Sequence, residues 1–272
     1  MHDDPYPPAS DFTVGEAIGE GHKLLMANYG LMLGAAIVVA LLTFAAMMVA
    51  GLIDAVLVGP DALFNPVSTA AQFLVQTPLG VGLGMLAARR YRDGEGSFED
   101  IFLGFSRYWP VVAIGFLMTV GYMVLTLAGF AGGALVVGVL LTVSPPAAIA
   151  VGVVLGIAFL VLLIYLAVRL WFAYLVCIDP RGAKPGPIDS IKISWYLTSG
   201  RAFKVWLVGL VMGIIGLVCL VLLILPFIFY ALPFYACAFG VLYVLLNPLP
   251  PEEGEQAVGD EMEPMGPPPL GA

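Results

Sequence analysis

Charged residues are scarce in this chain of 272 residues: Asp, Glu, Lys and Arg make up 11% of it, while hydrophobic types make up 61%. A soluble globular domain carries about 25% charged residues, so this composition excludes an ordinary water-soluble domain. The mean hydropathy of +1.00 indicates an integral membrane protein instead.

Cysteine and histidine are also rare. The three cysteines, Cys177, Cys219 and Cys237, lie within or beside apolar blocks and lack disulfide or metal-ligand spacing. This indicates small side chains buried in the membrane. The two histidines, His2 and His22, form no plausible Ser/His/Asp set or metal cluster with other residues. The sequence therefore predicts a protein that is not an enzyme and has no cofactor.

Lysine and arginine are absent from every second polar interruption between the apolar blocks. None occurs in Asp54–Ser68, in Ser144–Pro146 or around Pro226. Arg169 lies near the end of a block, and the other ten bases precede the first block or fall in the remaining interruptions. Because short loops rich in Lys and Arg stay cytoplasmic, we predict six spans in the inner (cytoplasmic) membrane of the cell, with both termini cytoplasmic. Bases so close to apolar blocks do not indicate nucleic-acid binding.

Six apolar blocks are long enough to cross a bilayer core of about 30 Å as helices. We predict spans at Gly30–Ile53, Ala70–Ala88, Val111–Leu141, Ala147–Val176, Phe203–Leu225 and Phe227–Leu246. They form an all-α membrane domain, residues 13–247, between a disordered N-terminus, residues 1–12, and a disordered acidic tail, residues 248–272. The third and fourth blocks exceed one crossing, so they tilt, kink near Gly129–Gly133, or project beyond the outer leaflet as a hairpin.

A short amphipathic stretch precedes each pair of spans. These stretches are Thr13–Asn28, Phe98–Tyr108 and Ile188–Arg201, and they start about 85 and 90 residues apart. Ser97 and Asp100 form an S-x-x-D capping pattern for the second stretch. The spacing predicts three repeats, each an interfacial amphipathic helix followed by a transmembrane hairpin, with all three helices on the cytoplasmic face. Ordinary amphipathic connectors at coincidental spacing are the alternative.

The third stretch contains the segment IDSIKISWYLTSG, from Ile188 to Gly200. It resembles the A-x-K-x-S-W-x-L-T-x-G signature of an uncharacterised group of bacterial six-helix integral-membrane proteins. That group is related to the membrane domain that accompanies some glycerophosphodiester phosphodiesterases. The resemblance covers most of residues 13–247, although Ser190 replaces the usual Ala and Asn247-Pro248 replaces a Tyr-Arg-Asp type ending. It implies a six-helix membrane protein and carries over no hydrolytic activity.

Arg169 is the base placed deepest in an apolar block. An Arg at the bilayer centre costs about 2.5–3.5 kcal/mol, so this residue either reaches the headgroups or pairs with a lipid phosphate or a carboxylate. The nearest acids expected on the cytoplasmic side are Glu16, Glu20, Asp100 and Asp189. The candidate lipid or ion-pair site consists of Arg169, Trp195, Lys192 and Arg201.

These features favour a non-enzymatic membrane scaffold or interaction module. Its surface helices bind membrane lipids with anionic headgroups on the cytoplasmic side, or a cytoplasmic protein partner. The alternative is a small transporter or channel with a path between the repeats. Few ionisable residues fall within the spans, which argues against ion-coupled transport.

Overall fold

The structure is a computed structural model, and it describes residues 11–59, 65–181, 184–222 and 224–247. Over these residues it is all-helical, and six helical runs are long and apolar enough to cross a membrane. The predicted all-α polytopic fold is confirmed. The predicted disordered ends lie outside the described residues, except for Asp11 and Phe12. Phe12 is buried, so the membrane domain begins before residue 13.

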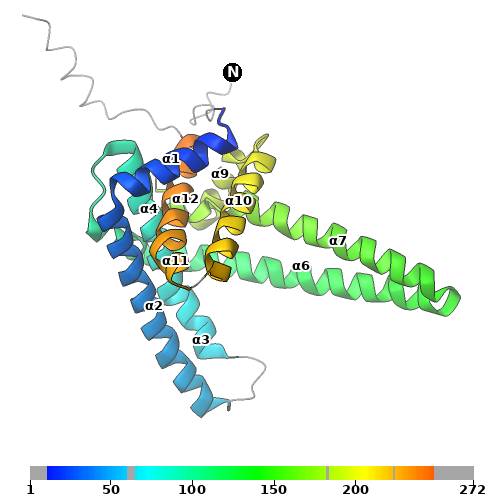
Figure 1. Cartoon of the computed structure of the whole chain (residues 1–272). Helices are drawn as coiled ribbons and strands as arrows, with labels where there is room; N and C mark the ends of the chain where they lie inside the picture. The colour runs from blue at the N-terminus through cyan, green and yellow to red at the C-terminus, as the bar shows by residue number, and fades with distance from the viewer. Residues whose placement is uncertain (1–10, 60–64, 182–183, 223, 248–272) are drawn as a thin grey trace, which may run out of the picture.

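The chain forms three successive units, each with short helical segments followed by two long runs of helix (Figure 1). The first comprises α1 (Val14–Ala27), α2 (Tyr29–Leu57), α3 (Pro66–Ala71), the π-helix η1 (Gln72–Gln76) and α4 (Thr77–Asp93). The second comprises the 3-10 helix η2 (Phe98–Phe102), α5 (Leu103–Ser106), α6 (Tyr108–Val143), α7 (Pro145–Leu170) and α8 (Ala173–Ile178). The third comprises α9 (Pro187–Leu197), α10 (Ala202–Leu222), α11 (Ile224–Pro226), the π-helix η3 (Phe227–Ala231) and α12 (Leu232–Leu246). The threefold repeat itself stays a prediction.

The six spans coincide with the six predicted blocks. They run over Tyr29–Leu57, Pro66–Asp93, Tyr108–Val143, Pro145–Ile178, Ala202–Leu222 and Phe227–Leu246. The second begins earlier than predicted, because the Asp54 carboxylate accepts the backbone N–H groups of Val67 (2.9 Å) and Ser68 (2.7 Å) and so caps α3. The fourth is interrupted at Trp171 and Phe172, between α7 and α8.

Two spans accommodate a proline inside a continuous run of helix. η1 ends two residues before Pro78, and η3 ends two residues before Pro233. A proline has no N–H to donate to the carbonyl one turn earlier, and its ring crowds that carbonyl. The π-helical turn widens the backbone there, and at η1 the Thr77 hydroxyl donates to the Gln72 carbonyl (3.0 Å). Both helices therefore continue through their prolines.

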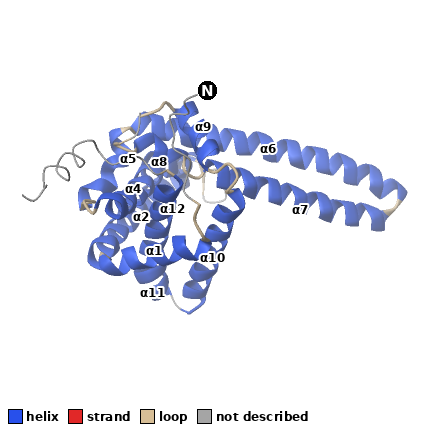
Figure 2. Ribbon diagram, turned by 90° about the horizontal axis from the view of Figure 1, so that it is seen from above, coloured by secondary structure: helices blue, strands red, loops and turns tan. Residues whose placement is uncertain are grey.

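The α6–α7 hairpin extends away from the other helices, as Figures 1 and 2 show. α6 is one helix of 36 residues, about 54 Å long at 1.5 Å per residue. It passes through Gly129–Gly133, where a kink was one of the three alternatives, as a single continuous helix. Gly129 instead admits the Phe159 ring of α7, since a Cβ at Gly129 would lie 2.5 Å from that ring. The hairpin turns at Ser144, as predicted.

The short helices that lead into the first two units begin with capping boxes. The Thr13 hydroxyl accepts the Glu16 N–H (3.1 Å), and the Glu16 carboxylate accepts the Thr13 N–H (3.3 Å). The predicted capping pair of Ser97 and Asp100 is confirmed, although it opens the 3-10 helix η2 and not an α-helix. The second amphipathic stretch therefore consists of two short segments, η2 and α5. Arg107 separates α5 from the long helix α6.

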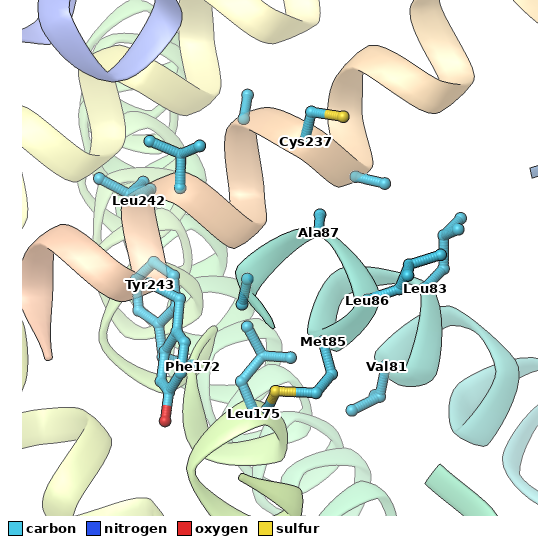
Figure 3. Close-up of a cluster of buried hydrophobic side chains, with 14 of the residues drawn as sticks. Val81, Leu83, Met85, Leu86, Ala87, Phe172, Leu175, Cys237, Leu242 and Tyr243 are labelled. Atoms are coloured by element: carbon cyan, nitrogen blue, oxygen red, sulfur yellow. The ribbon is translucent and has the colours of Figure 1, made fainter. Parts of the chain in front are cut away.

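The core lies where the second helical runs of the three units meet, as Figure 3 shows. The Tyr243 ring of α12 stacks on that of Phe172, just before α8, with ring centroids 6.3 Å apart. α4 and α12 pack closely because a glycine faces the α4 backbone: a Cβ on Gly240 would lie 2.6 Å from the Ala88 nitrogen. Small residues allow such close approach of helices in a membrane.

Candidate functional site

Arg169 lies in the last turn of α7 and is 8% exposed. Its Nε and Nη2 atoms donate to the Tyr165 hydroxyl (3.1 and 2.8 Å), and Nη1 donates to the Trp195 carbonyl oxygen (3.1 Å). The guanidinium carbon lies 5.1 Å from the Tyr165 ring centroid and 5.0 Å from the Trp195 ring centroid, within reach of a cation–π interaction. Two aromatic side chains and one carbonyl therefore hold this buried cation.

The four acids expected near Arg169 are held elsewhere. Glu16 caps α1, Glu20 pairs with Lys23 (2.8 Å), Asp100 pairs with Arg89, and Asp189 pairs with Lys192 (3.3 Å). Of the alternatives left open for Arg169, the pairing with one of these carboxylates is not the one seen in the described part of the chain, where each acid binds a group nearer to it in the sequence. The three hydrogen bonds of Arg169 use three of its five N–H hydrogens, so two remain for another acceptor.

One hydroxyl group on α9, that of Ser194, fixes the end of α7. The Ser194 hydroxyl donates to the Arg169 carbonyl (2.8 Å), and both Ser194 and the neighbouring Thr198 are buried. Carbonyl groups in the last turn of a helix have no partner within that helix, so this bond satisfies one of them. The same contact places Trp195, the residue after Ser194, against the Arg169 guanidinium. The arginine is thus positioned by the packing of α9 on α7.

A cavity of about 480 Å³, the first cavity, adjoins Arg169 between α7 and α10. Ile164 and Val168 line it from α7, and Phe203 and Trp206 line it from α10. Its volume falls in the range of small-molecule sites. A cavity with a cation at its edge and mostly apolar walls fits an amphiphile, with an anionic group at the arginine and a hydrocarbon part along the walls.

The structure brings together two of the four predicted site residues. Trp195 contacts Arg169 with both its carbonyl and its ring. Lys192 lies on the exposed face of α9, where its ammonium pairs with Asp189 (3.3 Å). Arg201 lies between α9 and α10; its neighbours in the sequence line the first cavity, but Arg201 does not. Lys192 and Arg201 are thus near the site in sequence but do not form its walls.

A second buried polar cluster, which the sequence did not predict, joins all three units. Asp179, after α8, accepts hydrogen bonds from Nη1 and Nη2 of Arg92 in α4 (both 3.1 Å). The Tyr243 hydroxyl of α12 donates to the same carboxylate (2.8 Å), and the Asn247 amide donates to that hydroxyl (3.0 Å). The Arg181 backbone N–H is a further donor to Asp179 (3.1 Å). These donors satisfy a buried carboxylate, which would otherwise be costly.

A sequence signal for this Asp179 cluster was available. The second span of each unit ends in an acid or amide followed by a residue that stops a helix: Asp93-Gly94, Asp179-Pro180 and Asn247-Pro248. Asp179 and Asn247 both belong to the cluster, and Asp93 pairs with the side chain of Arg181 (3.0 Å). The ends of the second spans of the three units therefore lie near one another.

Comparison of the chain with models of protein families, with curated proteins and with solved structures finds no match. The resemblance of the IDSIKISWYLTSG segment to six-helix membrane proteins therefore stays a prediction. No group of three or more His, Cys, Asp or Glu side chains suited to a metal ion occurs among the described residues.

Proposed function

We propose that this protein is a non-enzymatic membrane module that binds anionic lipid headgroups through Arg169. It resides in a bacterial inner membrane with both termini in the cytoplasm. The observation that carries this proposal is the setting of Arg169: the side chain is buried, keeps two N–H hydrogens for a further acceptor, and borders an apolar cavity.

A phospholipid has the chemistry that this setting requires. Phosphate oxygens accept guanidinium N–H groups in charge-assisted pairs, which are stronger than neutral hydrogen bonds. A buried cation gains most from such a partner, because the surrounding medium screens its charge weakly. The mostly apolar walls of the first cavity suit the hydrocarbon part of the same molecule. In a membrane, lipid is also the ligand present at the highest concentration.

The distribution of bases supports the proposed orientation. Arg90 donates to Asn28 (2.7 Å), Arg107 donates to the carbonyl groups of Cys177 (2.8 Å) and Pro185 (3.0 Å), and Lys204 pairs with Asp11. With the Arg92–Asp179 pair, these contacts link the three base-rich segments to one another. The end of the molecule with α1 and α9 (Figure 1) is therefore the proposed cytoplasmic side.

The exposed face of α9 supports a place at the membrane surface. Ile188, Trp195 and Tyr196 point outward, while Ser190 and Ser194 are buried. A helix in the headgroup region presents apolar and aromatic side chains in this way. The transport alternative gains no such support, because the first cavity offers no polar lining away from Arg169 and Tyr165.

The test measures the binding of phosphatidylglycerol to the delipidated protein in detergent, with native mass spectrometry as the readout. Arg169→Leu removes a charged hydrogen bond worth about 1.5–3 kcal/mol, so we expect affinity to fall by roughly tenfold to hundredfold. Arg169→Lys should restore only part of it, because an ammonium cannot reproduce the planar fork of a guanidinium. The thermal midpoint of each variant shows whether the fold persists.

Lys192→Leu is the matched control, since it removes a base from the exposed face of α9. We expect its phosphatidylglycerol affinity to stay within about twofold of the unmodified protein, because exposed charges contribute little. Phosphatidylcholine measures binding that does not depend on net charge. Equal phosphatidylglycerol binding by Arg169→Leu and the unmodified protein would overturn the proposal.

A further inference from the structure

The first cavity is the beginning of a longer groove along α10. A second cavity of about 560 Å³ shares Ile164, Val168 and Trp206 with the first. A third cavity of about 430 Å³ shares Trp171, Gly209 and Gly213 with the second and reaches α4 and α12. Neighbouring cavities share lining residues, so the three lie in a row beside α10; this row, here called the α10 groove, has Arg169 near one end.

The length of the α10 groove matches a lipid chain. Its lining on α10 runs from Phe203 to Leu217, which is about 21 Å at 1.5 Å per residue. One leaflet contributes about 15 Å of hydrocarbon, half of a bilayer core of about 30 Å. A chain that starts at the level of Arg169 would thus have apolar walls beside it for its full depth in the leaflet.

Two glycines of α10 line the middle of the α10 groove, and only the second has open space beside it. A Cβ on Gly209 would lie 2.9 Å from the Trp171 ring, whereas a Cβ on Gly213, one turn later, would meet no atom within 4 Å. Glycines in membrane helices commonly admit a neighbouring helix backbone. Within the described part of the chain no such backbone lies over Gly213, so the space there is available to a ligand.

We propose that the α10 groove holds one acyl chain of the phospholipid whose phosphate binds Arg169, and that the opening at Gly213 makes the site select long chains. This inference rests on the proposed function for its headgroup end. A chain in the groove replaces contacts with bulk lipid by contacts with Trp206, Trp171 and Phe239, the aromatic residues that line it. Packing of this kind is the main attraction available inside a membrane.

A helix from a second copy fits the α10 groove less well. An α-helix with its side chains is about 10 Å wide and needs a smooth face of small residues. Here the Trp206 and Trp171 rings stand in the groove and divide it into cavities of about 430–560 Å³. Cavities of that size suit a flexible chain.

The experiment compares Gly213→Leu with Gly156→Leu, a glycine of α7 that also has no atom within 4 Å of a built Cβ and lies outside the α10 groove. Each variant is delipidated and titrated with dilauroyl and dioleoyl phosphatidylglycerol. We expect Gly213→Leu to weaken dioleoyl binding about tenfold and dilauroyl binding less than about twofold. Gly156→Leu should change neither. If Gly213→Leu does not fold, Gly213→Ala should give a smaller shift in the same direction.

The outcomes separate the chain site from the headgroup site. In one outcome, Arg169→Leu loses binding of both lipids while Gly213→Leu keeps the chain preference of the unmodified protein. That result overturns the chain site and leaves the proposed function standing. A loss of dioleoyl binding in Gly213→Leu, with normal binding in Arg169→Leu, supports the chain site and overturns the headgroup assignment. An equal loss for both chain lengths in Gly213→Leu also overturns chain selection.

Discussion

Arg92 and Asp179 lie 87 positions apart in the sequence, and their side chains form an ion pair (3.1 Å) with only 8% and 1% of their surfaces exposed. The pair joins the end of the first hairpin to the end of the second. Tyr243 joins the third hairpin to the same carboxylate (2.8 Å). One buried acid thus connects the three hairpins, including the α6–α7 hairpin that projects away from the other two (Figure 1).

Removing that acid should destabilise the whole bundle. Asp179→Ala leaves the Arg92 guanidinium buried without its carboxylate, which costs about 3–5 kcal/mol in comparable pairs. We expect a large drop in the thermal midpoint in detergent. Asp189→Ala is the matched control, because Asp189 forms an exposed ion pair with Lys192 and such pairs contribute little. Similar midpoints for the two variants would show that the Asp179 cluster is not needed for stability.

The contact between α4 and α12 should not tolerate a methyl group. Gly240→Ala places a Cβ 2.6 Å from the Ala88 backbone nitrogen, so the two helices have to separate. Overpacking of this kind costs about 1–3 kcal/mol, measured as a lower midpoint of unfolding in denaturant. Gly132→Ala in α6 is the control, because its Cβ has no atom within 4 Å. Unfolding of Gly240→Ala at the original midpoint would contradict the observed packing.

The proposed orientation predicts which sites a membrane-impermeant thiol reagent reaches. In a variant without the three native cysteines, Ser97→Cys and Ser199→Cys should react only from the cytoplasm, because both lie beside base-rich segments. Asp61→Cys, in a segment outside the described residues, should react from the other side. Exclusive cytoplasmic labelling of Asp61→Cys would rule out the six-span topology as oriented here.

Trp195 should lie at the depth of the headgroups. It is 41% exposed and packs on Arg169 at the end of a span. In a variant with Trp109, Trp171 and Trp206 changed to Phe, quenching by brominated lipids should be strongest for bromine atoms near the headgroup. The strongest quenching from bromine at the bilayer centre would place α9 within the membrane and refute its surface position.

The N-terminal contact with α10 should depend on pH. The Lys204 ammonium, first by a hydrogen bond and then by its charge, holds the pKa of Asp11 below the ordinary value of 3.8. Because the folded-state pKa is lowered, the stabilisation is present above that ordinary value and is lost as pH falls through the lowered pKa. Asp11→Asn should therefore lower the thermal midpoint slightly near pH 7, and by less as the pH falls below 3.8. A difference that stays constant with pH would exclude this ion pair as its cause.

The spans could be predicted because each one corresponds to a single continuous apolar run, which is visible in the local sequence. The unusual position of Arg169 could be predicted for the same reason, and Tyr165, four residues earlier on one helical face, was a foreseeable partner. The Trp195 carbonyl was not, because this contact depends on how α9 packs against α7. Asp179 looked like an ordinary loop residue, since its partners come from segments 64 and 87 positions away.

The position of Tyr243 in the last helix, with Asn247 directly after that helix, sets the order in which the molecule can be completed. The ribosome makes Arg92 and Asp179 long before it makes α12, so the first two hairpins enter the membrane while the third is not yet synthesised. During that interval the Asp179 carboxylate lacks the hydroxyl that later donates to it. Insertion of the sixth span therefore finishes the assembly. A chain truncated before that span would keep the Arg92 and Arg181 donors to Asp179 but lack the contact that joins the third hairpin to it.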